Sequence, residues 1–445
     1  MNVISSCRSR ALAALLNPRT RAMRRSLAEK RRRLAGRSHV LKVFLELDDP
    51  YSYLLSVYLD EVASNYEVDL ELYLVQALDA AYRPRADMLA VYAERDCKRL
   101  ARELGVPFLD KGRAPPVEYR RALIDLAAEC QGQQDQDQEL VTVIGQYWRG
   151  DAEGVTRRVS GTVASRRGAA LLKKNQQLLR KLGHYNSAMI YYAGEWYWGV
   201  DRLHYLTQRL DELGARRAGA VPTKLASIGQ AMQVRLPVAP PSTAKELPPL
   251  ELFYSFRSPY AYLALSRVFA LADAFGLRLE VRPVLPMVMR GMQVPRSKRL
   301  YIIKDAAREA ERMDIPFGRF ADPLGRGVER CMAVFAYAQS EKRGRDFLIK
   351  AGEAIWAQGI DVATDKGMRK VTGRCGLFWP GAKAALADSS WRAAAEQNSE
   401  SMMASGTWGV PTLRLGKFVV WGQDRDWLLV RRIEELCHSG DGILI

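Results

Sequence analysis

Cysteine and histidine are scarce in this sequence, and they are scattered. Its 445 residues include six cysteines and four histidines, and no two cysteines form a Cys-x-x-Cys pair. This spacing fits neither a disulfide framework nor an ordinary zinc site. We therefore expect reduced thiols, no metal and a cytoplasmic location. Apolar runs of about 18 residues are also lacking, which argues against a membrane-spanning helix.

Acidic residues are few at the N-terminus, where most of the excess positive charge lies. Residues 1–40 contain eleven Lys and Arg and a single acid, Glu29, so they supply +10 of the net charge of +17. The remaining chain is only mildly basic, and we expect no specific nucleic-acid partner. Residues 1–38 are expected to be a disordered basic arm that makes at most weak contact with anionic surfaces.

The sequence contains an internal repeat. Residues 41–54 align with residues 250–263 at an offset of 209, and the same offset holds as far as Pro107-Phe108 and Pro316-Phe317. Near the end of each copy the offset becomes 223, where Trp198-Gly199 matches Trp421-Gly422. Two ordered blocks of this kind predict a tandem duplication.

Each copy has the same expected order of elements. A strand leads into a helix that begins at Pro-Tyr, a second strand follows, then about a hundred mostly helical residues, a hairpin of two short strands and a closing helix. The expected strands are 41–47, 68–75, 188–192 and 195–198 in the first copy and 250–256, 277–284, 411–415 and 418–421 in the second. This order is typical of the thioredoxin fold.

The predicted fold class is therefore α/β, with two thioredoxin-like domains that each carry a large helical insertion. Residues 217–249 separate them and contain Pro222, Pro237, Pro240, Pro241, Pro248 and Pro249, which predicts an extended, proline-rich linker. The resulting boundaries are a basic arm at 1–38, a first domain at 39–216, the linker at 217–249 and a second domain at 250–440.

The N-terminus of the first helix is the active position in a thioredoxin-like domain, because unpaired N–H groups and the helix dipole stabilise an anion there. These helices begin at Asp49-Pro50 and Ser258-Pro259, without sulfur. We therefore do not expect a dithiol oxidoreductase.

Four motifs of the second copy resemble a known family. They are Ser258-Pro-Tyr-Ala-Tyr-Leu, the segment Lys298 to Arg308, Trp408-Gly-Val410-Pro411-Thr and Trp421-Gly-Gln423-Asp424-Arg. Together they resemble the kappa-class glutathione transferases and the 2-hydroxychromene-2-carboxylate isomerases, which belong to the DsbA-like branch of the thioredoxin superfamily. The resemblance covers nearly all of residues 250–436.

The resemblance implies glutathione as cofactor and a role for each matching residue. Ser258 is the expected catalytic residue, whose hydroxyl faces the glutathione sulfur and favours the thiolate. Val410 and a cis Pro411 are expected to pair with the tripeptide backbone. Gln423 and Asp424 are expected to receive the γ-glutamyl ammonium, and Lys298 a glutathione carboxylate. The alternative to these roles is a plain N-cap for Ser258 and Asp424 and an exposed helix face for Lys298, and capping by Ser258 is compatible with its site role.

The first copy departs from these motifs. Asp49 stands at the Ser258 position, where its charge disfavours a thiolate, and Ala188 replaces Pro411. We interpret this copy as degenerate and retained for packing. The chain is then expected to be an intramolecular pseudo-dimer of its two repeats, with one active site.

The resemblance implies a glutathione-dependent isomerase that acts on a small aromatic or similar conjugated carbonyl substrate. A kappa-type glutathione S-transferase needs the same site and remains an alternative. An alternative of another class is a catalytically silent thioredoxin-fold binding module.

Overall fold

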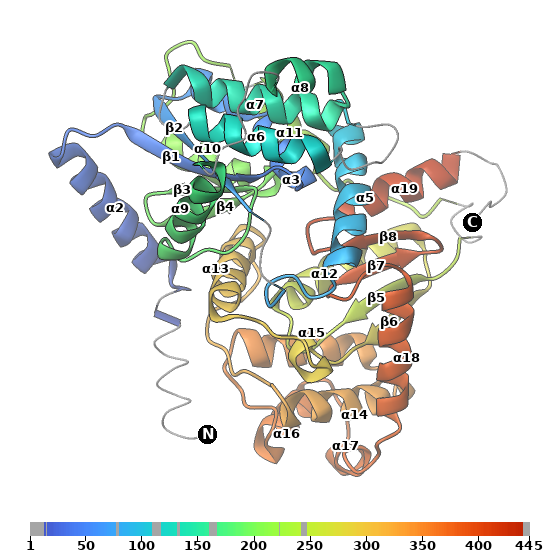
Figure 1. Ribbon diagram of the computed structural model, residues 1–445. Helices are drawn as coiled ribbons and strands as arrows, with labels where there is room; N and C mark the ends of the chain where they lie inside the picture. Colours follow the sequence, from blue (N-terminus) through green and yellow to red (C-terminus); the bar gives the residue numbers. More distant parts are fainter. Residues whose placement is uncertain are drawn as a thin grey trace. The chain divides into compact units, whose positions relative to one another are not determined.

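The structure is a computed structural model that describes residues 13–14, 16–76, 80–108, 117–130, 134–159, 167–221, 223–241 and 247–438. The chain divides into two compact units, one formed by Met1–Met23 with Val234–Ile445 and the other by Arg24–Gln233. Both are mixed α/β and rich in helix (Figure 1). The second boundary falls inside the segment predicted to be a linker.

The N-terminal unit, Arg24–Gln233, is built on a four-stranded sheet of order β2-β1-β3-β4. Strand β1 is parallel to β2 and antiparallel to β3, which forms a hairpin with β4. The strands are β1 (His39–Glu46), β2 (Val68–Val75), β3 (Met189–Tyr192) and β4 (Glu195–Trp198). The helices are α3 (Pro50–Ser56), α4 (Leu59–Asn65), α5 (Ala86–Leu104), α6 (Val117–Cys130), α7 (Gln134–Arg149), α8 (Ala152–Val159), α9 (Arg167–Lys181), α10 (Leu203–Glu212) and α11 (Thr223–Ala231), with a 3-10 turn η1 (Val200–Arg202).

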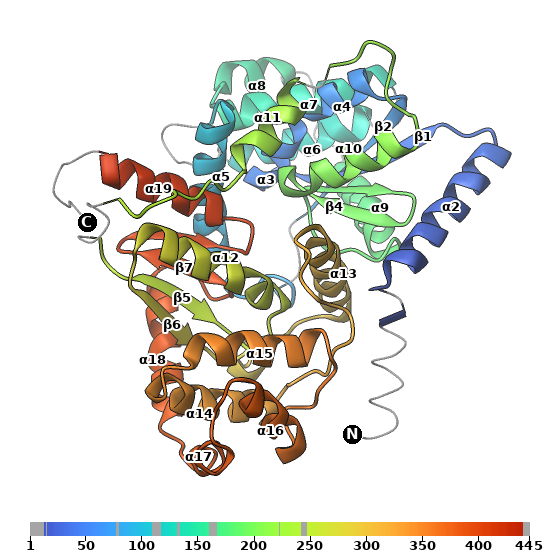
Figure 2. The same cartoon turned by 180° about the vertical axis from the view of Figure 1, so that it is seen from behind.

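The C-terminal unit repeats this topology with a sheet of order β6-β5-β7-β8 and the same strand directions. Its strands are β5 (Leu250–Tyr254), β6 (Leu279–Pro283), β7 (Thr412–Leu415) and β8 (Phe418–Trp421). Its helices are α12 (Pro259–Phe275), α13 (Arg296–Arg312), α14 (Arg326–Ser340), α15 (Gly344–Trp356), α16 (Asp365–Arg374), α17 (Trp379–Ala385), α18 (Trp391–Ala404) and α19 (Asp426–His438), with a 3-10 turn η3 (Met287–Arg290). Helices α12 and α18 lie on opposite faces of the sheet (Figure 2).

Two tertiary hydrogen bonds recur at an offset of 209 residues. The Tyr51 hydroxyl donates to Asp96, as that of Tyr260 does to Asp305, each at 2.8 Å. The Tyr53 and Tyr262 hydroxyls donate to the carbonyl oxygens of residues 107 and 316, both prolines. Each bond ties the first helix of its unit to the segment that follows the second strand, so equivalent positions make equivalent contacts.

Three segments differ from the sequence-based expectation. Residues 18–34 form a helix, α2 (Pro18–Leu34), where a disordered arm is predicted. Arginine, lysine, alanine and leucine favour helix, and Glu29 pairs with Arg32 and Arg33 one turn on. Residues 1–12 of that arm lie outside the described part.

The other two differences are a helix inside the predicted linker and a break in the first helix of the N-terminal unit. Helix α11 interrupts residues 217–249, and its first turn is capped by the Glu61 carboxylate, which accepts from the Lys224 and Leu225 amides at 2.8 and 2.9 Å. The helix expected to begin at Pro50-Tyr51 is broken at residues 57–58 into α3 and α4. The equivalent helix α12 is continuous from Pro259 to Phe275.

Candidate active site

Ser258 caps the N-terminus of α12. Its backbone is extended, with φ −96° and ψ 115°, and its hydroxyl oxygen accepts a hydrogen bond from the Ala261 amide at 3.1 Å. Pro259 occupies the first turn, where a missing N–H costs nothing. The helix is long, and its dipole and unpaired amides create a positive potential at this end. The position of Ser258 therefore favours a negatively charged atom.

The Ser258 hydroxyl also reaches the loop before β7. It donates to the Val410 carbonyl oxygen at 3.2 Å. The Val410–Pro411 peptide bond is cis, as predicted from the sequence. Within the part of the chain that the structure describes, the Val410 amide donates to no backbone oxygen. The structure thus brings three of the predicted site residues together, and it leaves one backbone donor beside them.

This loop is anchored to the core. The Val410 side chain packs on a cluster of Phe253, Val284 and Met402. The Gly422 amide donates to the Pro411 carbonyl at 2.9 Å, which joins the loop to the turn after β8. The loop and the β8–α19 turn therefore have a fixed register.

Glycine is required at position 409 because the loop runs against a tryptophan ring. A Cβ atom on Gly409 would lie 2.3 Å from Cζ2 and 2.7 Å from Nε1 of Trp421. The rings of Trp408 and Trp421 pack edge to face, with centroids 4.6 Å apart. The two Trp-Gly motifs of the sequence are therefore parts of one packing arrangement.

Arg290 supports the same loop, a role that the sequence analysis did not predict. It lies at the end of η3, and its guanidinium donates to the Trp408 carbonyl at 2.5 Å and to the Ser399 hydroxyl at 3.2 Å. Burial lowers the pKa of Arg290 to about 10, so it stays charged at neutral pH. Its contacts join residues more than a hundred positions apart, and no local pattern encodes them.

Gln423 lies in the turn between β8 and α19, where its side-chain amide is fully engaged with two helices. Its nitrogen donates to Glu309 of α13 at 2.8 Å, and its oxygen accepts from Arg267 of α12 at 2.8 Å. Arg267 also donates to Asp426 at 2.6 Å. Only 3% of Gln423 is exposed, and these hydrogen bonds fix the turn in place.

The two charged residues predicted for the site lie on different elements, Asp424 in the turn between β8 and α19 and Lys298 on α13. Asp424 is half-buried, in the turn that Gln423 fixes, with one carboxylate oxygen 3.7 Å from Arg425. Lys298 lies in the first turn of α13. Burial lowers the pKa of Lys298 to about 8, so the ammonium still predominates at neutral pH.

Asp305 and Arg308 have structural roles. Arg308 donates to the buried Asp305 carboxylate at 2.7 Å, while the other oxygen of that carboxylate accepts from Tyr260. These bonds tie α13 to the start of α12, and they position the helix that carries Lys298.

The equivalent position in the N-terminal unit has a different chemistry. Asp49 caps α3 and accepts from the Tyr51 amide at 3.2 Å and from the Ser52 and Ser187 hydroxyls at 2.9 and 2.8 Å. Burial raises the pKa of this carboxyl group. Ala188 has a φ of 53° and, among the described residues, only Val410–Pro411 is cis. The Asp49 carboxylate is thus hydrogen-bonded to residues of its own unit, Tyr51, Ser52 and Ser187.

No group of three His, Cys, Asp or Glu side chains in the described part could hold a metal ion. Of the cysteines whose side chains the structure describes, Cys97, Cys331 and Cys375 are buried and Cys437 is partly exposed. None caps the helix that carries the candidate site. The described residues also include no helix long and apolar enough to cross a membrane.

Comparison with known proteins identifies a domain in the C-terminal half of the chain. The family model of the DSBA-like thioredoxin domain matches residues 249–434. A 2-hydroxychromene-2-carboxylate isomerase from Pseudomonas putida is 23% identical over 198 residues, which cover 43% of this chain and 96% of the relative.

Solved structures show similarity over the same share of the chain. A structure of 2-hydroxychromene-2-carboxylate isomerase is 23% identical, with a TM-score of 0.38, and covers 43% of this chain and 96% of its own. A probable DsbA oxidoreductase from Streptomyces coelicolor is 13% identical, with a TM-score of 0.35, and covers 44% of this chain and 92% of its own. The cytosolic disulfide reductase DsbM from Pseudomonas aeruginosa is 18% identical, with a TM-score of 0.33, and covers 42% of this chain and 98% of its own. The C-terminal half of the chain is a DsbA-like thioredoxin domain that is similar to 2-hydroxychromene-2-carboxylate isomerase.

Proposed function

We propose that the C-terminal domain is a glutathione-dependent isomerase similar to 2-hydroxychromene-2-carboxylate isomerase, acting on a small aromatic or similar conjugated carbonyl compound. The observation that carries the proposal is the Ser258 hydroxyl, held at the N-terminus of α12 and 3.2 Å from the carbonyl before cis Pro411. The relative matches this chain over 96% of its own length, so nearly all of it aligns with the C-terminal domain.

The residues of the site fit glutathione. Its thiolate would supply the nucleophile for reversible addition to a conjugated carbonyl compound. The end of α12 offers positive potential and the Ser258 O–H, which together stabilise a negatively charged sulfur. The Val410 amide, which donates to no described backbone oxygen, offers a strand-like hydrogen bond to a peptide carbonyl.

The charged residues suit the two ends of the tripeptide. Asp424 would accept from the γ-glutamyl ammonium, and Lys298 would bind a carboxylate of glutathione. Gln423 would assist this contact by positioning Asp424, because its amide holds the turn that carries Asp424 against α12 and α13. This arrangement assigns binding to the termini of the ligand and chemistry to Ser258.

The proposal is tested with the full-length chain and 2-hydroxychromene-2-carboxylate, followed by its change in ultraviolet absorbance. We expect conversion with glutathione and none without it. Conversion that does not depend on glutathione would contradict the proposal. Conjugation of glutathione to an aryl halide, without isomerisation, would instead identify a kappa-type transferase.

A thermal denaturation series distinguishes an enzyme from a silent scaffold. Glutathione at about one hundred times its Kd adds about 2.7 kcal/mol to the stability of a domain that binds it. Absence of both a thermal shift and turnover would mean that the domain is a thioredoxin-fold binding module without this chemistry.

We further propose that the chain is a tandem duplication with one active site. The same strand order in both sheets and the pairs Tyr51–Asp96 and Tyr260–Asp305 support this interpretation. Asp49 and Ala188 stand where the active copy has Ser258 and Pro411, and the first copy would then contribute packing, as one half of an intramolecular pseudo-dimer.

A further inference from the structure

Helix α2 exposes an unusual stripe of large apolar side chains. Met23, Leu27 and Leu34 are 72%, 49% and 89% exposed. Their spacing of four and seven residues places all three on one face of the helix. No residue of α2 is buried, so the stripe contributes nothing to the described core.

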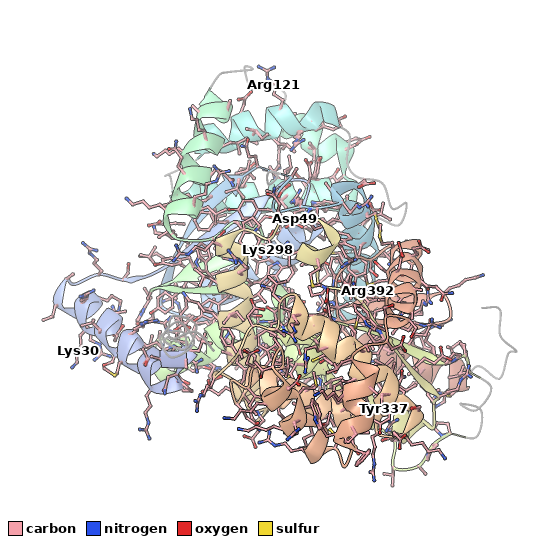
Figure 3. All side chains as sticks on the ribbon, turned by 90° about the horizontal axis from the view of Figure 1, so that it is seen from below. Lys30, Asp49, Arg121, Lys298, Tyr337 and Arg392 are labelled. Carbon is pink, nitrogen blue, oxygen red and sulfur yellow. The ribbon has the colours of Figure 1, made fainter. Side chains whose placement is uncertain are left out.

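Positive charge borders this stripe on both sides. At 100° per residue, Arg19 and Lys30 fall along one edge of the stripe, and Arg24 and Arg31 along the other. All four are exposed. Figure 3 shows Lys30 extending from the helix.

The opposite face of α2 pairs with acidic groups. Arg25 makes two hydrogen bonds to the Glu195 carboxylate at 2.7 and 2.8 Å. Arg32 binds Glu29, and this bond holds the pKa of the Glu29 carboxyl at about 2. The only acid of the helix therefore faces away from the stripe, and the charged residues along its edges are all cations.

We propose that α2 is an interfacial anchor that binds the surface of a bilayer containing anionic lipid. A helix that lies in the plane of the membrane inserts an apolar stripe to the depth of the headgroups while flanking lysines and arginines meet anionic phosphates. Nucleic acid would use the cations but would gain little from three exposed aliphatic side chains. The stripe is the feature that selects lipid.

Co-sedimentation of the full-length chain with vesicles tests the proposal. We expect binding to vesicles of phosphatidylcholine mixed with phosphatidylserine and much less to phosphatidylcholine alone. The triple variant Met23→Ser, Leu27→Ser, Leu34→Ser should bind these vesicles at least about tenfold more weakly than the wild type. Arg24→Gln with Arg31→Gln should lower binding by about thirtyfold, since each of the two cations contributes about 1 kcal/mol near an anionic surface.

A matched control replaces three exposed apolar residues outside α2. Val91, Val238 and Phe378 are 69%, 107% and 71% exposed, and their replacement by serine should leave vesicle binding unchanged. Far-ultraviolet circular dichroism confirms that each variant is folded. Equal vesicle binding by wild type and the Met23, Leu27, Leu34 variant would overturn the proposal. So would binding to duplex DNA without binding to anionic vesicles.

Discussion

At the scale of single residues, Ser258 makes two hydrogen bonds with one hydroxyl group. It accepts from the Ala261 amide and donates to the Val410 carbonyl. The first is an N-cap that any serine could supply, and the second directs the O–H toward the cis-proline loop. In the proposed enzyme a ligand sulfur takes the place of the Val410 oxygen as acceptor.

Ser258→Ala should lower the glutathione-dependent kcat/KM by about 10- to 100-fold, because a hydrogen bond to a charged group contributes about 1.5–3 kcal/mol. The variant also loses an N-cap, which costs about 1 kcal/mol of stability. Steady-state kinetics and urea unfolding measure the two effects separately.

Thr364→Ala is the matched control for the loss of a cap. The Thr364 hydroxyl caps α16, accepts from the Gly367 amide at 3.1 Å and donates to the Asp361 carbonyl at 2.8 Å. It should cost a similar stability without lowering kcat/KM. If both variants lost activity equally, Ser258 would have only its capping role.

Because of Glu46, we predict that the stability of the N-terminal unit depends on pH. Burial raises the pKa of this carboxyl group from 4.5 to about 7, against the opposing effect of the Arg83 guanidinium 2.6 Å away. Its proton is therefore bound more tightly in the folded state than in the unfolded state. Stability should fall as pH rises from about 4.5 to about 7 and change little above that range.

Glu46→Gln should flatten this dependence, because an amide does not titrate. Thermal unfolding between pH 4 and pH 8 measures it, with the transition of the C-terminal domain as an internal reference. A slope in the variant equal to that of the wild type would show that other groups cause it.

At the scale of elements, the cis-proline loop and β8 depend on a close approach of backbone to ring. Gly409→Ala should destabilise the C-terminal domain by about 1–3 kcal/mol, because the added methyl group would overlap Trp421. Gly373→Ala is the comparison, since a Cβ there meets no described atom within 4 Å and the residue lies inside α16. It should stabilise by about 0.5–1 kcal/mol. Equal urea midpoints for the two variants would contradict the packing argument.

Local patterns in the sequence predict many of these elements. The strand ranges expected from the sequence agree to within two residues with the eight strands in the described part of the chain, and Ser258-Pro259 marks the start of α12. These patterns do not predict contacts between a long side chain and residues far away in the sequence. Arg290 and Arg267 fix the two loops of the site through contacts over more than a hundred residues, and neither belongs to a motif.

The basic arm shows a different kind of failure. Charge density argues for a disordered tail, but Arg25 and Glu29 find partners that hold residues 18–34 as a helix. Its apolar stripe is recognisable only when the helical period is known. The sequence alone therefore indicates the charge of the arm and not its two faces.

At the scale of the whole molecule, the two units share one topology and differ at two positions of the proposed site, Asp49 against Ser258 and Ala188 against Pro411. A serine hydroxyl faces the loop in the C-terminal domain, whereas the N-terminal unit has a carboxyl group bound to Ser52 and Ser187. The two units thus share a fold but not the same site residues, and we predict that glutathione binds the C-terminal domain and not the N-terminal unit.

The most direct test of this account is the stoichiometry of glutathione binding to the full-length chain by isothermal titration calorimetry. We predict one molecule per chain, with affinity retained in Asp49→Asn and weakened in Asp424→Asn. Two molecules per chain, none, or loss of binding in Asp49→Asn alone would contradict the assignment of the active site to the C-terminal domain.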